Sequence, residues 1–534
     1  MTCSEASSAF GSYRTAPRIC DDPVTFNSMI SIYPALKGPG ARLRQFLGMD
    51  SDTGGDVDVL VVGAGLSGVA AGYYLRSRLP RARFAILEAR SRIGGTWDLF
   101  RYPGVRSDSD MHTLGFSFRP WRGDAALAGG SSIETYIDDT ARELGIDRHI
   151  RFEHRAVRAS WSGADARWHV DVLARGVPVR MRCRFLYSCT GYYDYERGYL
   201  PAFDGIERYR GVLVHPQAWP QKLDYRGKRV LIVGSGATAG TMVPAMAREA
   251  AHVTMLQRSP TYILSVPGRD AVAHLINRAL PARLAHALVR WKNVLRQMFF
   301  YNAMRRNPEF WRKAILRLTR AAVGPKIDVE RHFVPRYAPW DQRMCFVPDG
   351  DFFAALRDGS ASIVTGEIDR FTERGLRLRS GEELEADVIV TATGLNLLLL
   401  GGMQIDVDGA PVEVAKTVSY KGMMFCGVPN LALALGYTNA SWTLKCELTA
   451  RYVCRLVGYL ERTGYAYCVP QEPDPSVGTE PAITLTSGYV QRAASRLPRQ
   501  GKRAPWRLYQ NYALDLASLR FGRLDDGVMR WARS

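Results

Sequence analysis

Two segments of the chain show the same order of apolar run, glycine-rich turn and helix-like stretch. In the first, an apolar run over 57–62 leads into Gly63-Ala-Gly65-Leu-Ser-Gly68 and a helix-like stretch over 69–79. A second strand-like run, Phe84 to Glu88, follows. A short β-branched run, a turn, a helix and another strand form a βαβ unit of the usual length.

The second segment repeats this order about 170 residues later. An apolar run over 229–233 enters Gly234-Ser-Gly236-Ala-Thr-Ala239, a helix-like stretch follows, and a strand-like run over 252–258 closes the unit. The pattern predicts an α/β protein with two Rossmann-like dinucleotide-binding domains, separated by basic helices over about 271–335.

The repeated order of strand, glycine-rich turn and helix predicts the following division of the chain. Residues 1–55 form a flexible N-terminal extension, 56–200 the first part of one domain, 201–385 the second domain with its helical insertion, and 386–534 the return to the first domain with a tail. Met49 stands shortly before the first strand, so the leader is either an addition ahead of the true start or a genuine flexible arm.

Composition narrows the classes of function. At 534 residues the chain is too long for a single core, and its net charge is +19. The basic residues are spread along the chain without a nucleic-acid-binding motif, which favours an Arg-rich surface with sites for phosphate-bearing cofactors over a nucleic-acid partner. Nine cysteines without a C-x-x-C pair indicate reduced thiols in a cytoplasmic protein, and argue against a dithiol–flavin disulfide reductase.

The first glycine fingerprint predicts an FAD site. Gly63 permits the tight turn, Gly65 lets backbone N–H groups approach a pyrophosphate, and Gly68 lets helix and strand pack closely. Glu88 ends the second strand 20 residues after Gly68, where a carboxylate hydrogen-bonds the ribose of an adenosine without a 2′-phosphate.

The second fingerprint predicts an NADPH site. Gly234 and Gly236 keep their roles and Ala239 takes the third position, an accepted variant. The strand that follows ends in Arg258 and Ser259 instead of an acid. An acid would repel a 2′-phosphate and an arginine would pair with it, so NADPH is favoured over NADH.

Longer motifs resemble those of the Baeyer–Villiger monooxygenases. Residues 94–108 match one long motif of that family, and 209–220 match its second signature, F-x-G-x-x-x-H-x-x-x-W-P, with Tyr209 in place of the first Phe. Residues 340–348 and 437–445 resemble the ethionamide-activating subgroup in particular. The resemblance runs from about 57 to 530 and leaves out 1–48.

The resemblance implies a function and a set of site residues. NADPH reduces FAD, oxygen adds at flavin C4a, and the peroxyflavin attacks a ketone to give an ester or lactone, while NADP+ stays bound. Arg343 and Asp108 are the implied catalytic residues: Arg343 supplies a permanent cation beside the peroxide, and Asp108 holds it and borders the cofactor. The residues implied to line the flavin are Gly94, Gly95, Thr96 and Trp97.

Other motif residues are interpreted as structural and not as catalytic. His215 invites a general-base role, but a structural or domain-motion role is favoured because its signature lies in the linker to the second domain. Trp219 is interpreted as packing. Asn439 and Trp442 lie in a loop expected to close the cofactor region. The basic helices are interpreted as a lid over the substrate pocket with a solvated outer face, and weak contact with a membrane is the alternative.

Three other functions stay open at this point. The same enzyme type could oxygenate sulfur or nitrogen in thioethers, thioamides or amines. An uncoupled NADPH oxidase or flavin reductase would have no need of Arg343, and a nucleotide-sensing protein would have no activity. The expected partners are a small organic substrate and O2, with neither a metal nor nucleic acid; the oligomeric state is left open.

Overall fold

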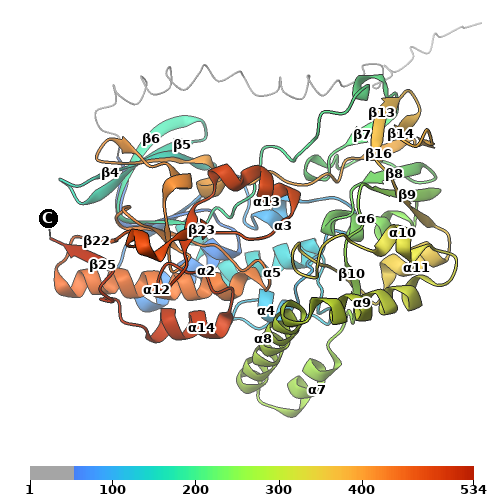
Figure 1. The fold of residues 1–534 in the computed structure, drawn as a ribbon. Coiled ribbons are helices and arrows are strands. Elements are labelled where there is room, and N and C mark those ends of the chain that lie inside the picture. The colour runs from blue at the N-terminus through green and yellow to red at the C-terminus, as the bar shows by residue number, and fades with distance from the viewer. Residues whose placement is uncertain (1–52, 534) are drawn as a thin grey trace, which may run out of the picture. The chain divides into compact units, whose positions relative to one another are not determined.

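The computed structural model describes residues 53–533, so the predicted N-terminal extension over 1–55 lies almost entirely outside the described residues. Within 53–533, no helix combines the length and apolarity needed to cross a bilayer. The chain builds two large sheets, one mixed and one parallel, with helices around them (Figure 1), which gives the α/β class that the two fingerprints predict.

The first sheet has nine strands in the order β18-β17-β4-β5-β6-β1-β2-β3, with β21 paired to β6. Its strands are β1 (Thr53–Val62), β2 (Phe84–Glu88), β3 (Ile150–Phe152), β4 (His154–Ser162), β5 (Arg167–Ala174), β6 (Val177–Ser188), β17 (Gln404–Val407), β18 (Ala410–Pro411) and β21 (Leu431–Leu433). Because β17, β18 and β21 come after the second domain, the chain returns to its first sheet, as the sequence predicts.

Helices cover the first sheet along one continuous core. These helices are α2 (Leu66–Arg78), α3 (Thr96–Leu99), α4 (Met111–Leu114), α5 (Gly130–Glu143) and α12 (Trp442–Thr463). Val59 and Val61 of β1 and Val69 of α2 are fully buried there, together with Tyr452 of α12. Val59 and Tyr452, 393 positions apart, therefore share one apolar core, which fixes α12 against the first fingerprint.

The second sheet has five parallel strands in the order β12-β9-β8-β16-β7. They are β7 (Val212–Val214), β8 (Arg229–Val233), β9 (His252–Gln257), β12 (Ala361–Thr365) and β16 (Val388–Val390), with α6 (Ala237–Met246) and α11 (Asp351–Arg357) packed against them. The predicted boundary at 386 is therefore wrong by several residues, because β16 pairs with both β7 and β8 and lies inside the second domain. The return to the first domain follows Gly394.

The remaining strands form small sheets at the edges of the two domains. In the second domain these are β10 (Ile263–Val266) with β11 (Cys345–Pro348), and β13 (Ile368–Thr372) with β14 (Gly375–Leu378) and β15 (Glu383–Glu385). The C-terminal part adds β19 (Ser419–Tyr420), β20 (Met424–Phe425), β22 (Tyr467–Pro470), β23 (Thr479–Pro481), β24 (Arg499–Gly501), β25 (Met529–Ala532), α13 (Gly488–Ala493) and α14 (Tyr512–Leu516).

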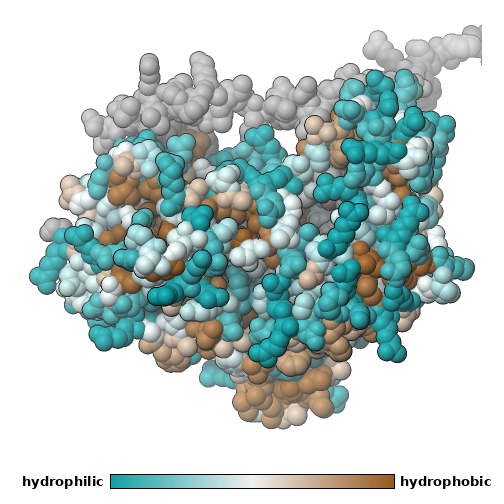
Figure 2. All heavy atoms as spheres, in the orientation of Figure 1, coloured by the Kyte–Doolittle hydropathy of each residue, from teal (hydrophilic) through white to brown (hydrophobic). Residues whose placement is uncertain are grey.

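The predicted helical insertion is present between β10 and β11. It consists of α7 (Ala271–Ala279), α8 (Ala282–Arg306), α9 (Pro308–Val323) and α10 (Val329–Phe333). Asp270 accepts a hydrogen bond from the Ala273 N–H at the start of α7, and Asn307 accepts one from the Phe310 N–H at the start of α9. The outward surface of α7 and α8 is apolar (Figure 2), which contradicts the solvated outer face expected from the sequence.

A buried ion pair fastens α8 to the first domain. Arg290 donates to the Glu447 carboxylate at 2.8 Å and to the carbonyl oxygens of His112 and Gly115 at 3.1 and 2.7 Å. The two charged side chains are 7% and 4% exposed. Because both charges lie away from water, each depends on the other for its compensation.

We expect Arg290→Met to lower the free energy of unfolding by about 3–5 kcal/mol, because the buried Glu447 carboxylate then loses its ion-pair partner and keeps only its hydrogen bonds to Ser117 and Tyr74. Chemical denaturation followed by fluorescence measures the change. The double variant Arg290→Met/Glu447→Leu removes both charges and should recover most of the loss. A single variant within about 1 kcal/mol of the wild type would contradict the pairing.

Candidate cofactor sites and active site

The first fingerprint turn is set by close backbone approaches. Gly63 has φ +104°, and a Cβ there would lie 2.6 Å from the Cys189 carbonyl oxygen. A Cβ on Gly68 would lie 1.9 Å from the Gly63 carbonyl oxygen. Only glycine fits at either position, so strand β1 can turn sharply and helix α2 can begin directly above it.

Glu88 stands at the end of β2, beside this turn. Its carboxylate is buried and accepts hydrogen bonds from the backbone N–H groups of Ala64 and Arg90, at 2.8 and 2.9 Å. Burial raises the pKa of Glu88, and the two N–H bonds oppose that rise. The carboxylate is therefore held in place directly beside the fingerprint turn.

Gly95, Thr96 and Trp97 open helix α3 directly opposite the fingerprint. A Cβ on Gly95 would lie 3.1 Å from Gly65 Cα, so the two glycine backbones approach each other closely. The Thr96 hydroxyl lies 3.2 Å from the hydroxyl of Tyr195, a residue that the motifs do not single out. Trp97 packs against the first core.

The next residue fixes α3 in place. The Asp98 carboxylate is buried and accepts hydrogen bonds from Arg90 and Arg101, both at 2.6 Å. The glycine pair and this anchored helix make a narrow, backbone-lined cradle. Its residues fit a flavin dinucleotide, because α2 begins at this turn, a helix N-terminus favours a phosphate, and Gly65 and Gly95 carry no side chains there.

The second fingerprint has the same turn, with more open space beside its second glycine. Gly234 has φ +134° and a Cβ there would lie 2.2 Å from the Ala392 carbonyl oxygen, whereas a Cβ on Gly236 would meet no atom within 4 Å. Ala239 is fully buried in α6. The turn is close-packed on the protein side and empty on the outer side, which fits a bound pyrophosphate.

Arg258 and Ser259 follow β9 and border this second turn. The Ser235 hydroxyl donates to the Ser259 carbonyl oxygen at 3.3 Å, which joins the two loops. Arg258 is exposed and forms no ion pair with any residue of 53–533. A free guanidinium at this place is available to a phosphate.

Arg343 and Asp108 meet across the two domains. Arg343 Nε lies 3.0 Å from Asp108 Oδ2, and Nη2 lies 2.9 Å from Oδ1, which is a bidentate ion pair. The charge of Asp108 raises the pKa of Arg343 above its usual value. The hydrogen bond between these residues that the resemblance implies is thus present, and Arg343 stays charged at any working pH.

Three tyrosines that the sequence does not single out surround this pair. Tyr192, Tyr193 and Tyr489 are close enough for Arg343 to oppose the rise in their pKa values. Burial nevertheless dominates and raises the pKa of Tyr193 to about 12. The tyrosines therefore remain neutral around the Arg343 guanidinium, and their segments carry no motif that would predict this contact.

Trp442, whose loop is predicted to close the cofactor region, contacts the first turn of α2. Its indole N–H donates to the Ser67 hydroxyl at 3.1 Å in the first turn of α2, and its ring centroid lies 4.9 Å from that of Tyr192. A largely apolar pocket opens beside the two rings. Its lining includes Leu399, Met423, Met424, Leu435, Ile483 and Leu497.

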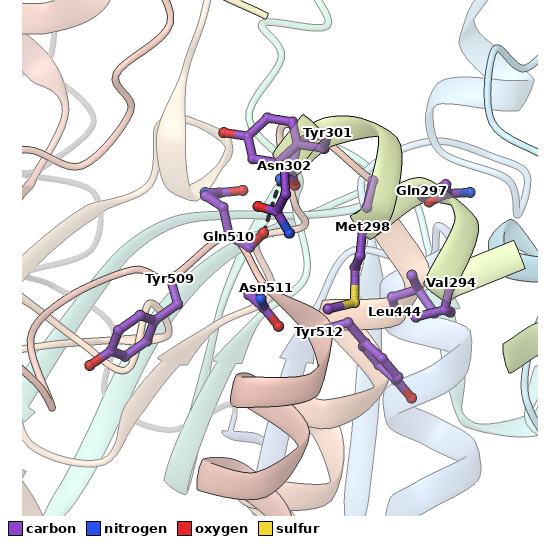
Figure 3. A pocket seen from close by; sticks show the side chains of 12 residues that line it. Val294, Gln297, Met298, Tyr301, Asn302, Leu444, Tyr509, Gln510, Asn511 and Tyr512 are labelled. Atoms are coloured by element: carbon purple, nitrogen blue, oxygen red, sulfur yellow. Dashed lines mark hydrogen bonds between the residues drawn. The ribbon is translucent and has the colours of Figure 1, made fainter. Parts of the chain in front are cut away.

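Asn439 lies in a second cavity, between α8 and the C-terminal segment (Figure 3). Its side-chain N–H donates to the Gln510 carbonyl oxygen at 2.9 Å, while its Oδ1 is buried without a partner among the described residues. Gln297 and Met298 of α8 line the same cavity, as does Tyr512. The insertion thus forms one wall of this cavity.

His215 and Trp219 make backbone and packing contacts among the described residues. The Gln217 N–H donates to His215 Nδ1 at 3.2 Å, and His215 Nε2 lies 3.3 Å from the carbonyl oxygen of Gly394. Burial lowers the pKa of His215, so the ring is neutral and ties β7 to the turn where the chain leaves the second domain. Trp219 packs edge-on against Tyr225.

Comparison with known proteins agrees with this geometry. The family model described as "NAD(P)-binding Rossmann-like domain" matches residues 61–123, and "Flavin-binding monooxygenase-like" matches 115–300. FAD-containing monooxygenase EthA of Mycobacterium tuberculosis is 52% identical over 89% of this chain and 98% of its own length. This confirms the family resemblance found in the motifs.

Solved structures share the fold. A steroid monooxygenase bound to NADP superposes with a TM-score of 0.73 at 23% identity, over 90% of this chain and 100% of the other. A cyclohexanone monooxygenase bound to ε-caprolactone gives 0.70 at 20% identity, over 89% and 99%. The fold class, the FAD and NADPH cofactors and the enzyme class predicted from the sequence are confirmed: the chain belongs to the flavin-binding monooxygenase-like family, as an FAD-containing, NADPH-dependent monooxygenase.

Proposed function

We propose that this monooxygenase converts apolar ketones into esters or lactones, with FAD bound at the first fingerprint and NADPH at the second. The observation that carries the proposal is the bidentate pair of Arg343 and Asp108, which comes from two domains and stands among neutral tyrosines. When bound, FAD takes a hydride from NADPH and, once reduced, activates O2.

Arg343 supplies a fixed positive charge where negative charge develops during oxygen transfer. Asp108 occupies its Nε and Nη2, and Nη1 has no partner in the described part of the chain. A guanidinium held on one edge in this way presents the other edge in a set direction, toward an oxygen anion or the carbonyl oxygen of a substrate. Asp108 is a positioning residue in this role.

The apolar pocket beside Tyr192 and Trp442 supports an apolar substrate. Its lining is dominated by Leu, Met and Ile side chains, with few groups that could bind a charged compound. The ε-caprolactone-bound relative of similar fold carries the lactone expected from a cyclic ketone. These points favour oxygen insertion beside a carbonyl over oxygenation of sulfur or nitrogen.

Incubation with NADPH, 18O2 and parallel panels of ketones and sulfides tests this choice. We expect esters or lactones that carry one 18O atom, identified by mass spectrometry after correction for uncoupled peroxide. Sulfoxides alone, from panels of matched size and polarity, would overturn the ketone proposal and favour the heteroatom oxygenase.

The cytoplasm is the proposed location. Seven of the nine cysteines lie within the described residues, and all seven are buried and unpaired. Reduced thiols and a need for NADPH both suit a reducing compartment.

Arg258 and Ser259 are proposed to select NADPH through its 2′-phosphate. We expect Arg258→Ala to raise KM for NADPH by about 10–100-fold while KM for NADH changes little, because a charge-assisted hydrogen bond contributes about 1.5–3 kcal/mol. Steady-state oxidation of both cofactors measures this. Arg248→Ala removes another exposed arginine of the same domain and should leave both KM values unchanged; equal shifts for the two cofactors would contradict the site.

A further inference from the structure

The exposed large hydrophobic side chains are concentrated on the helical insertion. Of fifteen such side chains among the described residues, ten belong to α7, α8 and α9. They are Val272, Leu275, Leu284, Leu288, Trp291, Leu295, Phe299, Phe300, Phe310 and Leu318. Over α7 and α8 they form the hydrophobic area at the bottom of the view in Figure 2. A patch of this kind on a water-facing surface indicates a binding partner.

Helix α8 carries apolar side chains on two opposite sides. Val289 and Val294 are buried against the protein. Leu288, Leu295 and Phe299 recur at helical spacing on the outward side and are 44%, 55% and 65% exposed. A helix that served only as a lid over a pocket would need the inner side alone. The outer stripe therefore has its own partner.

The same helices hold an unusual concentration of positive charge. Residues 271–323 contain eleven Lys and Arg and a single acidic residue, Glu309, in a chain whose net charge is +19. Arg278, Arg283 and Arg296 are exposed and form no ion pair within 53–533. Basic side chains thus flank the apolar stripe.

We propose that α7, α8 and α9 form a surface that docks onto an anionic lipid bilayer. Leu, Phe and Trp side chains would enter the boundary of the acyl chains while Arg side chains contact the phosphate headgroups, as in interfacial amphipathic helices. A bilayer fits better than a second copy of this chain, because a two-fold interface would set two strongly basic surfaces against each other. None of the helices within 53–533 could cross the bilayer, so the docked helices would lie in the plane of the membrane.

Co-sedimentation of the full-length holoenzyme with vesicles tests the proposal. We expect binding to phosphatidylcholine vesicles that contain phosphatidylglycerol, weaker binding to pure phosphatidylcholine, and a decrease at high salt. The variant Leu275→Ser/Leu295→Ser/Phe299→Ser should lose more than about tenfold of its affinity. The matched control Val177→Ser/Leu514→Ser/Phe521→Ser changes three exposed apolar residues elsewhere and should bind like the wild type.

A second pair of variants tests the charges. Arg278→Gln/Arg283→Gln/Arg296→Gln should reduce binding to the anionic vesicles, whereas Arg81→Gln/Arg148→Gln/Arg523→Gln should not, although it removes the same charge from exposed positions. Bound flavin and circular dichroism report folding without reference to activity. Wild-type protein that fails to bind anionic vesicles would overturn the proposal. So would control variants that lose as much vesicle affinity as the variants of α7 and α8. If the wild type formed oligomers and bound no vesicles, and the apolar variant were monomeric, the surface would be assigned to self-association instead.

Discussion

Arg343→Ala is expected to abolish oxygenated product while NADPH still reduces the bound flavin at close to the wild-type rate. The residue belongs to neither glycine fingerprint, and in the proposed function its charge serves oxygen transfer and not flavin reduction. Loss of one preorganised electrostatic group at such a place lowers the rate by about 100–1,000-fold. Anaerobic stopped-flow measures the reduction, and product analysis under O2 measures the transfer.

Two further variants separate this role from a loss of structure. Arg182 forms a bidentate pair with Asp56 at 2.8 and 3.0 Å on the outer part of the first sheet, so Arg182→Ala removes an ion pair of the same geometry and should leave product formation intact. Arg343→Lys keeps the charge but loses the two-pronged contact, and we expect an intermediate yield. Ester formation by Arg343→Ala at the wild-type rate would refute the assignment.

Gly65→Ala is expected to weaken the binding of FAD alone, and Gly236→Ala the binding of NADPH alone. Both glycines have φ near −78°, at −79° and −77°, which alanine adopts readily. A Cβ on Gly65 would meet protein atoms only at 3.5 Å or more, and one on Gly236 would meet none within 4 Å. The protein should therefore fold, while the added methyl group occupies the space of a pyrophosphate.

The loss of even one phosphate hydrogen bond should weaken cofactor binding by about 10–100-fold. Gly65→Ala should be isolated with little FAD, and Gly236→Ala should keep its FAD but require far more NADPH. Flavin content and KM for NADPH measure the two effects, and thermal unfolding checks the fold. If either substitution affected both cofactors equally, the assignment of one nucleotide to each fingerprint would be wrong.

The fold could be predicted from local patterns, above all the two glycine-rich turns that follow apolar strands. Close packing forces glycine at Gly63 and Gly234, so both turns were visible in the sequence. Asp108 and Arg343, 235 positions apart, could be paired only because each lies in a motif that resembles a family. Periodicity alone does not bring such distant residues together.

What the sequence missed depends on long-range packing. Strand β16 lies between β7 and β8, and no local signal says which sheet a three-residue strand joins. Tyr192, Tyr193 and Tyr195 stand in a linker without a motif, yet the fold carries them to Arg343 and Thr96. The outer stripe of α8 was hidden because apolar residues occur on both of its sides.

A single-turnover experiment with the purified holoenzyme tests the central claim most directly. The protein is reduced with one equivalent of NADPH without oxygen, then mixed with 18O2 and a cyclic ketone. The account predicts that the yellow flavin colour disappears on reduction and returns with oxygen, with one labelled lactone formed for each NADPH consumed. A protein that holds no FAD, or that returns to its oxidised colour with ketone unchanged and only hydrogen peroxide formed, would contradict it.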